Sequence, residues 1–551
     1  RLWRKLGLLK RTGKGGSTSS SSSKNLFAIR KGHKEARARS VLYIVQLFLA
    51  MAVASDDAID VMRGTAGLID SVVPCSSYAK KEQFRRRWVR YPLEIVKKRL
   101  SSLRAAARDA AAGGGGSERP FIKAASVGSR GISGEILRTS NMVLASIGHN
   151  VWVPKIPGQK GLRILCLDGG GSRGVTAIES MRAIVDAMGG IEVADTFDII
   201  AGTSTGAIIA FLVGLRRETS EKAKDRYDKL IRRIFVKSAT SLPMLVFTTA
   251  SYDERHFNQV MQEVLGDTSM LESRADPSVP LVFAISSKMS SNPIKISLFR
   301  NYNYGGGELA DSFTLNPEEA REKLGLAEKD DTLEHLDVEG LTEVMAGSTD
   351  TSGTKGSRHS GSFRILQRAA LRATTAAPTF FKPVMMGGEL YSDGGIVSSN
   401  PAAVAIHEAR TLFPDVPIEM VVSCGTGGFV EERSPPKIGW DGIIGQIVNS
   451  ATDGEQIHHI LEDILGEGGM ISSVSDTKYF RFNPVVGSCD EYPIDVTEPE
   501  KLARLADITK AYMREPKQQR KLREISDILE GKQGGLKKVL GEWTRSNGTE
   551  E

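Results

Sequence analysis

A short apolar run that turns through a glycine-bracketed serine into an apolar helix is the feature that most constrains this chain. Residues 197–200 have the composition of a buried strand, and residues 207–215 continue as an apolar helix. Between them a G-x-S-x-G pentapeptide places Ser204 between Gly202 and Gly206. Because glycine has no Cβ, such a turn holds its serine at a sharp, exposed corner between strand and helix. The pattern predicts an α/β fold with Ser204 available as a nucleophile, although a purely structural turn can carry the same letters.

A second glycine-rich turn precedes the first by one strand and one helix. Residues 161–167 are apolar and predict a buried strand, and residues 175–188 have helical spacing. The loop between them, residues 168–174, has the sequence DGGGSRG. Strand, glycine loop and helix in this order are typical of the first half of a βαβ unit.

The glycine loop has two interpretations. Its G-x-G-x-x-G spacing matches a dinucleotide fingerprint, in which Asp186 or Glu192 would be the acidic ribose ligand. Alternatively, the backbone N–H groups of residues 169–172 form a nest that faces a developing negative charge. The serine turn that follows favours the nest, because a nucleotide site has no use for Ser204. Arg173 would then either hold the geometry of the nest or meet a phosphate.

A third glycine turn lies much further along the chain and contains Asp393. It follows a predicted strand over residues 386–390 and precedes a predicted helix over residues 402–412. An aspartate before two glycines is commonly only a turn. Here it stands at the carboxyl end of a strand, where the sites of open α/β sheets gather. Asp393 is therefore a candidate partner for Ser204.

Composition bounds the organisation of the whole chain. Its 551 residues exceed one typical domain, so a large core with added segments, or two to three domains, is expected. The net charge is +7, and the basic excess precedes residue 131, which favours an anionic partner there: membrane surface, nucleic acid or import machinery. The four cysteines lie far apart without a C-x-x-C pair, which argues against a zinc site or disulfide framework and for a reducing compartment.

The composition of the first 116 residues indicates three segments that precede the main predicted domain. Residues 1–40 are basic, serine-rich and poor in acids, which predicts disorder, as either an organelle transit peptide (mitochondrion or plastid) or a solvated tail. Within residues 41–116, the apolar run 41–54 is shorter than the roughly 20 residues of a membrane span, which favours an interfacial or buried helix. Residues 80–104 are basic and aromatic, which is typical of a helix that binds an anionic lipid surface; a solvated helix without lipid contact would have the same composition. A flexible glycine linker ends this region at residue 116.

The remaining segments complete the expected domain organisation. The catalytic domain is placed at residues 117–435, and its further strands are expected over residues 280–286, 294–301 and 418–423. Residues 305–362 change to an acidic and then Gly/Ser/Thr-rich composition, which predicts a surface insertion. Residues 436–551 are expected to be mainly helical, with a capping box at residues 497–500.

The three glycine turns in this order resemble the patatin-like phospholipases, and within them the gamma-type calcium-independent phospholipases A2. FRNY at 299–302, RATTAAP at 372–378, NP at 400–401 and GTG at 425–427 look like further parts of the same pattern. The resemblance covers residues 160–430. It implies an α/β fold, a three-layer α/β/α domain with a mostly parallel central sheet, and helical flanks.

The resemblance also implies a role for each matching residue. Ser204 would be the nucleophile, Asp393 the base of a two-residue dyad, and Gly169, Gly170 and Gly171 the oxyanion loop. The supporting motif positions are Asp168, Arg173, Gly174, Gly202, Gly206, Gly394 and Gly395.

The implied activity is that of an intracellular, membrane-associated lipid acyl hydrolase. It would cleave fatty acyl esters of membrane glycerophospholipids through an acyl-enzyme, without calcium, metal or cofactor, with a phospholipid surface and no nucleic acid as partner. Two alternatives stay open. A Ser-His-Asp triad would draw on His407, His458 or His459. A lipid-binding scaffold would bind without turnover, although all three chemical motifs are intact.

Overall fold

The computed structural model describes most of the chain from residue 131 onward. The described residues are parts of 41–62, and 131–156, 159–235, 252, 254–304, 358–378, 380–429, 454–466, 477–488 and 491–530. The predictions for residues 1–40, for 80–104 and for most of 305–362 therefore lie outside them. Contacts divide the chain into two units, residues 1–144 and 145–551. Within the described part, every helix is too short or too polar to cross a bilayer.

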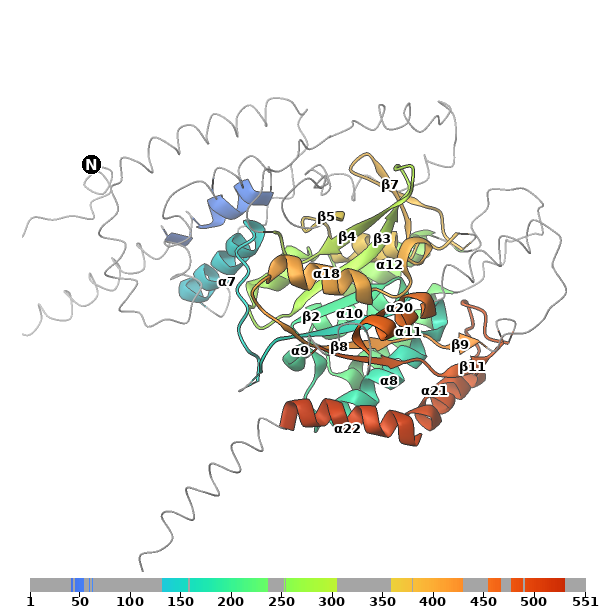
Figure 1. The fold of residues 1–551 in the computed structure, drawn as a ribbon. Coiled ribbons are helices and arrows are strands. Elements are labelled where there is room, and N and C mark those ends of the chain that lie inside the picture. The colour runs from blue at the N-terminus through green and yellow to red at the C-terminus, as the bar shows by residue number, and fades with distance from the viewer. Residues whose placement is uncertain are drawn as a thin grey trace, which may run out of the picture. The chain divides into compact units, whose positions relative to one another are not determined.

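The central sheet of the second unit is mostly parallel, as the sequence predicts (Figure 1). Its first five strands in spatial order run parallel, and β4 and β7 are both antiparallel to β3. β5 lies beyond β4, and β6 pairs with β7. The order is β10 (Lys478–Phe482), β8 (Ile418–Cys424), β1 (Leu162–Leu167), β2 (Ile199–Thr203), β3 (Leu281–Lys288), β4 (Lys295–Arg300) and β5 (Ser360–Ser362), with β6 (Val384–Met386) and β7 (Glu389–Asp393) off this path.

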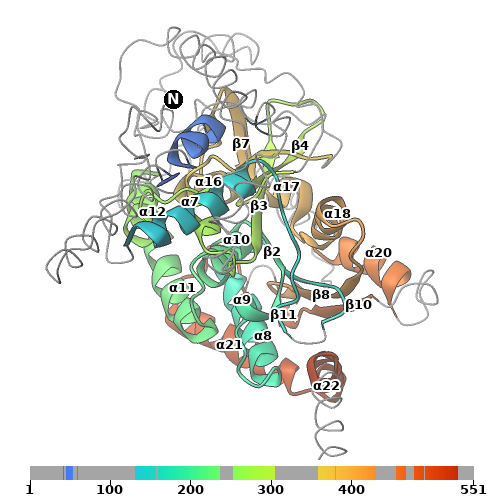
Figure 2. The same ribbon diagram turned by 90° about the vertical axis from the view of Figure 1, so that its left-hand side faces the viewer.

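Helices cover both faces of the sheet, because its strands are apolar on both faces. On β1, Leu165 and Leu167 belong to one hydrophobic cluster, whereas Ile164 and Cys166 belong to the other. Figure 2 shows the resulting layers, with α8 and α11 on one side of the strands and α18 and α20 on the other. The first side holds α8 (Gly174–Ala187), α10 (Thr205–Ala210), α11 (Ser220–Ile234), α12 (Glu254–Leu265), α16 (Gln367–Thr374) and α22 (Pro516–Glu530); the second holds α18 (Ala402–Leu412) and α20 (Glu455–Leu465).

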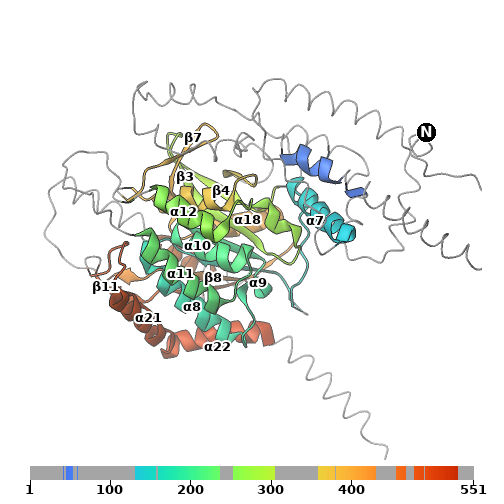
Figure 3. The ribbon, with the colours of Figure 1, turned by 180° about the vertical axis from the view of Figure 1, so that it is seen from behind.

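The C-terminal region contributes a strand to this sheet, which therefore extends beyond the predicted domain end at residue 435. β10 pairs in parallel with β8, and β11 (Val485–Gly487) pairs with β9 (Gly428–Phe429) in a small second sheet. β10 has only five residues, and an arginine interrupts its apolar pattern. The sequence pattern therefore does not predict a buried strand there. In the view of Figure 3, α21 (Pro499–Met513) and α22 lie at the lower edge of the unit.

The starts of two helices are set by local contacts. α16 begins at Gln367, after β5 and a turn in which the N–H of Arg364 donates to the Ser362 hydroxyl. The predicted capping box at the start of α21 does not form. Glu498 is the N-cap of α21 and makes no side-chain capping bond, which leaves Thr497 one residue outside the helix end.

Candidate active site

Ser204 occupies the corner between β2 and α10 in a backbone conformation that L-residues rarely adopt. Its φ is 52° and its ψ is −121° at the N-cap of α10. The flanking glycines allow close packing of the turn: a Cβ at Gly206 would lie 2.1 Å from the carbonyl oxygen of Leu167, and one at Gly202 would lie 2.4 Å from that of Gly206. Such a strained serine persists only where the surrounding structure fixes it, which is typical of functional sites.

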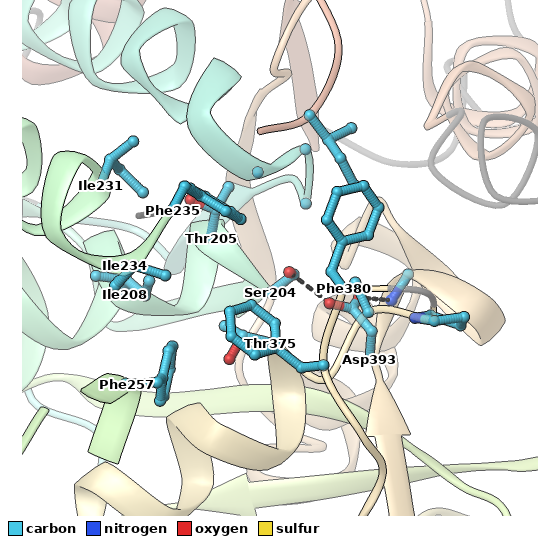
Figure 4. Close-up of a pocket in the computed structure, with 18 of the residues that line it drawn as sticks. Ser204, Thr205, Ile208, Ile231, Ile234, Phe235, Phe257, Thr375, Phe380 and Asp393 are labelled. Carbon is cyan, nitrogen blue, oxygen red and sulfur yellow. Dashed lines mark hydrogen bonds between the residues drawn. The ribbon is translucent and has the colours of Figure 1, made fainter. Parts of the chain in front are cut away.

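Asp393 lies directly opposite this serine. The Ser204 Oγ donates a hydrogen bond of 2.7 Å to Asp393 Oδ2, and the N–H of Gly395 donates one of 2.7 Å to Asp393 Oδ1 (Figure 4). The register of the sheet brings Ser204 and Asp393 together, although they are 189 positions apart in the chain. Thr203 of β2 pairs with Ile285 of β3, and Asp393 pairs with the next residue, Ser286.

Burial changes the acidity of Asp393. The residue is 5% exposed, and desolvation raises the pKa of its carboxyl group from 3.8 to about 6. The hydrogen bonds from Ser204 and Gly395 oppose this shift, because they favour the charged form. The carboxyl group therefore has an affinity for protons that suits a general base near neutral pH.

The end of α16 holds both reactive groups. The N–H of Ser204 donates to Thr374 Oγ1 at 2.9 Å, and Thr374 Oγ1 in turn donates to the carbonyl of Ile285. The N–H of Gly394 donates to the Thr374 carbonyl at 3.1 Å, and that of Asp393 donates to the Ala376 carbonyl at 3.0 Å. One helix end thus bonds to the turn of the serine and to the turn of the aspartate.

The glycine loop after β1 lies beside the serine, but its three glycines are not equivalent. The N–H of Gly169 donates to the Ser399 carbonyl at 3.1 Å, so it is not available to an oxyanion, contrary to the prediction. The Gly169 carbonyl accepts a bond of 2.7 Å from Thr426 Oγ1, and the Gly171 carbonyl accepts one of 2.8 Å from the Tyr227 hydroxyl. Gly170 and Gly171 remain the candidate donors, since within the described part no acceptor is found for either N–H.

The supporting motif residues hold this loop. Arg173 is buried, donates from Nε to the Gly170 carbonyl at 3.2 Å and lies over the Phe429 ring at 4.5 Å, which favours the geometric role over a phosphate contact. Gly174 begins α8 against the Tyr227 hydroxyl, which a Cβ would approach to 2.2 Å. A Cβ at Gly394 would similarly lie 2.2 Å from the Ile285 carbonyl oxygen.

A cavity of about 290 Å³ opens beside Ser204 and Asp393. In Figure 4, Ile208, Ile231 and Ile234 lie on one side of Ser204 and Asp393 lies on the other. Because the walls are almost entirely apolar, the cavity suits a hydrocarbon chain. Its lining includes Gly169, Gly170, Gly171, Ile208, Ile231, Ile234, Phe235, Phe257, Phe380, Phe381, Ile396 and Ile494.

The candidate histidines of a triad lie elsewhere. Among the described residues, no histidine lines the cavity. His407 Nε2 accepts a bond of 3.3 Å from the N–H of Arg358, and the His458 ring lies 5.4 Å from that of His459. Of the two suggested ribose ligands, Asp186 is exposed, and Glu192 accepts a bond of 2.9 Å from the N–H of Ser220. Within the same part of the chain, no three His, Cys, Asp or Glu side chains are grouped as a metal site would require.

Several residues of the site have no role in the sequence prediction. Thr374 and Thr426 lie inside the motifs RATTAAP and GTG, but the motifs alone assign no role to either threonine. Tyr227 on α11 and Ile494 before α21 bond to the glycine loop from outside these motifs; the Ile494 carbonyl accepts a bond of 2.7 Å from the N–H of Ser172. Arg481 of β10, which lies 2.6 Å from the Asp168 carboxylate beside the glycine loop, is indicated in the sequence only by an arginine inside a short aromatic run.

Comparison with known proteins gives a family match and several sequence relatives. Residues 165–406 match the family model described as patatin-like phospholipase. The chain is 30% identical to calcium-independent phospholipase A2-gamma of Oryctolagus cuniculus over 73% of this chain and 43% of that protein. It is 29% identical to phospholipase A I of Arabidopsis thaliana over 63% of this chain and 26% of that protein.

The chain therefore spans less than half the length of these relatives. Among solved structures, human GIVD cytosolic phospholipase A2 aligns over 68% of this chain and 63% of that one, with 12% identity and a TM-score of 0.29. The family match covers the end of β1, the glycine loop, the serine turn and Asp393, which are the parts that form the site. Residues 165–406 are accordingly a patatin-like phospholipase domain.

Proposed function

We propose that this chain is a calcium-independent phospholipase A that hydrolyses fatty acyl esters of glycerophospholipids through a Ser204–Asp393 dyad. One observation carries the proposal: the 2.7 Å hydrogen bond from Ser204 Oγ to a buried carboxylate at the wall of an apolar cavity. A nucleophile and a base within hydrogen-bond reach are the parts that acyl transfer requires. The cavity provides a place for one acyl chain beside them. The names of the relatives, phospholipases A, agree with this substrate class.

The first half of the reaction forms an acyl-enzyme. Ser204 Oγ attacks the ester carbonyl carbon while its proton passes to Asp393 Oδ2 along the existing hydrogen bond. The carbonyl oxygen becomes an oxyanion, which the N–H groups of Gly170 and Gly171 stabilise. The carbon–oxygen bond to the glycerol backbone then breaks, and the proton on Asp393 moves to the departing alkoxide. The products are a lysophospholipid and a fatty acyl ester of Ser204.

The second half repeats these steps with water. Asp393, again a carboxylate, accepts a proton from a water molecule that attacks the acyl carbon. The same two N–H groups stabilise the second oxyanion, and the proton returns to Ser204 Oγ as the fatty acid departs. Because protein groups supply both the base and the oxyanion donors, no step needs calcium. The substrate would be presented by a phospholipid surface, with its acyl chain drawn into the cavity.

Trapping the intermediate tests the proposal directly. Vesicles of a phospholipid with a labelled acyl chain are mixed with the protein in the presence of EGTA, and the reaction is stopped with acid. We expect released fatty acid and a labelled peptide that contains Ser204. Binding to the vesicles without fatty acid release would favour a scaffold. Activity that EGTA removes would contradict calcium independence, and a label on another residue would contradict the assigned nucleophile.

The pH dependence of the reaction follows from the raised pKa of Asp393. The base must be deprotonated, so kcat/KM should fall about tenfold per pH unit below pH 6 and level off above pH 7. Initial rates between pH 4.5 and 8 on a soluble short-chain ester would measure this profile without the influence of a membrane surface. A flat profile from pH 5 to 8, with circular dichroism unchanged, would rule out Asp393 as the base.

A further inference from the structure

A buried ion pair lies directly behind the glycine loop. Asp168, the residue before the three glycines, meets Arg481 of β10, with 2.6 Å between its Oδ2 and Arg481 Nη2. Both side chains are only 3% exposed. Removing two charges from water is costly, and the pair is retained only where good geometry and further hydrogen bonds compensate. Arg481 lies beyond residues 165–406, the part of the chain that matches the family model.

Arg481 uses its remaining donors on two more elements. Its Nη2 also contacts Glu455 Oε1 at 2.7 Å, its Nε contacts the same oxygen at 3.1 Å, and its Nη1 donates to Ser423 Oγ at 2.8 Å. Burial lowers the pKa of Arg481, but the carboxylates of Asp168 and Glu455 outweigh it and raise that pKa above its ordinary value. One planar guanidinium thus joins the ends of β1 and β8 to the start of α20.

The same cluster reaches the glycine loop by a second route. Asn483 donates from Nδ2 to Glu455 Oε1 at 2.8 Å, and its Oδ1 accepts a bond of 2.8 Å from the N–H of Gly427. These contacts hold the turn after β8, in which Thr426 bonds to the Gly169 carbonyl at 2.7 Å. Thr426 also packs against Gly170 so closely that a Cβ there would lie 2.1 Å from Thr426 Oγ1.

We propose that Arg481 is a positioning residue that sets the place of the Gly170 and Gly171 N–H groups through Asp168 and through the turn at Thr426. The inference rests on the proposed function, since it concerns the oxyanion donors of that reaction. Arg481 is not among the residues that line the cavity, so it does not contact the acyl chain. Oxyanion donors work only within about 2.7 to 3.1 Å of the developing charge, and a misplacement of about 1 Å can cost roughly 100-fold in rate.

Replacement by lysine separates the charge from the geometry. In Arg481→Lys the positive charge stays, but an ammonium group cannot span Asp168, Glu455 and Ser423 as the planar guanidinium does. We expect kcat on a soluble short-chain ester to fall about 10- to 100-fold, with KM changed less than about threefold because the cavity is intact. The rate of Ser204 labelling by a fluorophosphonate, which also develops an oxyanion, should fall in parallel.

Arg163→Lys is the matched control. Arg163 is also fully buried and pairs with a carboxylate of β8, Glu419, at 2.8 Å, but it lies at the opposite end of β1 from the glycine loop. It should lower Tm about as much as Arg481→Lys and leave kcat within about twofold of wild type. An equal loss of kcat in both variants, or an unchanged kcat in a folded Arg481→Lys, would overturn the inference.

Glu455→Gln keeps the test decisive if Arg481→Lys does not fold. This variant retains the size of the side chain but removes the charge that Arg481 and Asn483 both contact, and it leaves the Arg481–Asp168 pair in place, so kcat should fall about three- to tenfold. An unchanged kcat in folded Glu455→Gln would again count against a positioning role. The proposed function fails in a different way: wild type and Arg163→Lys would then show no Ser204-dependent turnover, and the inference would fall with it.

Discussion

Replacing Ser204 with alanine is expected to lower the rate of phospholipid hydrolysis by about 10⁴-fold or more. Without Oγ there is no nucleophile. The acyl-enzyme cannot form, even though the glycine loop and Asp393 are still in place. The alanine takes the same positive φ of 52° with the same backbone strain, so the fold should persist. Fatty acid release from labelled vesicles, with circular dichroism as the check on folding, measures the outcome.

A second serine provides the control for this experiment. Ser180 is fully buried on α8, and its hydroxyl has no hydrogen-bond partner among the described residues. Ser180→Ala should therefore keep the wild-type rate. Ser204→Ala that releases fatty acid as fast as Ser180→Ala would show that another residue is the nucleophile and would end the assignment of the G-x-S-x-G turn.

Asp393→Asn is expected to remove most of the activity while it makes the protein more stable at neutral pH. An amide cannot accept the serine proton, and loss of a general base costs up to about 10⁴-fold in rate. If a histidine were the base, His407→Gln, His458→Gln or His459→Gln would show a comparable loss. We expect each of these three variants, and the exposed Asp186→Asn, to keep the wild-type rate.

The gain in stability has a definite dependence on pH. The pKa of Asp393 is about 6 in the folded protein and near 3.8 in an unfolded chain, so the native state binds the proton more strongly. Wild-type stability therefore falls as the pH rises from about 4 to 6, whereas an asparagine has no charge to bury. The advantage of Asp393→Asn should reach about 3 kcal/mol above pH 7 and vanish below pH 4. Equal denaturant midpoints for the two proteins at pH 8 would contradict the burial of a charged carboxylate.

The parts of the fold that the sequence predicted are those with a local signal. β1 and β2 are apolar runs that end in glycine turns, and β3, β4 and β8 were likewise expected near their observed positions. Cys166 on β1 and Cys424 on β8 are fully buried within these apolar strands, and burial raises the pKa of the Cys424 thiol to about 12.

The parts that the sequence did not predict depend on partners distant in the chain. Thr374 is an ordinary helix residue until β2 and β7 place Ser204 and Gly394 beside it. Gly169 fits an oxyanion motif, but its N–H is taken by Ser399, which lies on a different segment. Arg481 can be buried in β10 because it pairs with Asp168 and Glu455. Without knowledge of these partners, an arginine within an apolar run argues against a buried strand.

Predictions about the first 130 residues stay predictions. The organelle signal of residues 1–40, the basic lipid-facing helix of residues 80–104 and the membrane as a partner concern segments outside the described residues. Residues 45–53 of the apolar run at 41–54 are helical, as expected.

The end of α16 has a consequence for the timing of events in the proposed reaction. Because Thr374 and Ala376 bond to the turns of both Ser204 and Asp393, the two reactive groups cannot separate unless those hydrogen bonds break. Their distance is thus set when the chain folds and not when a lipid arrives, so no reorganisation of the dyad is needed at the moment of reaction. Any adjustment to different acyl chains falls instead on the aromatic and isoleucine side chains of the cavity, which can change rotamer without moving the nucleophile.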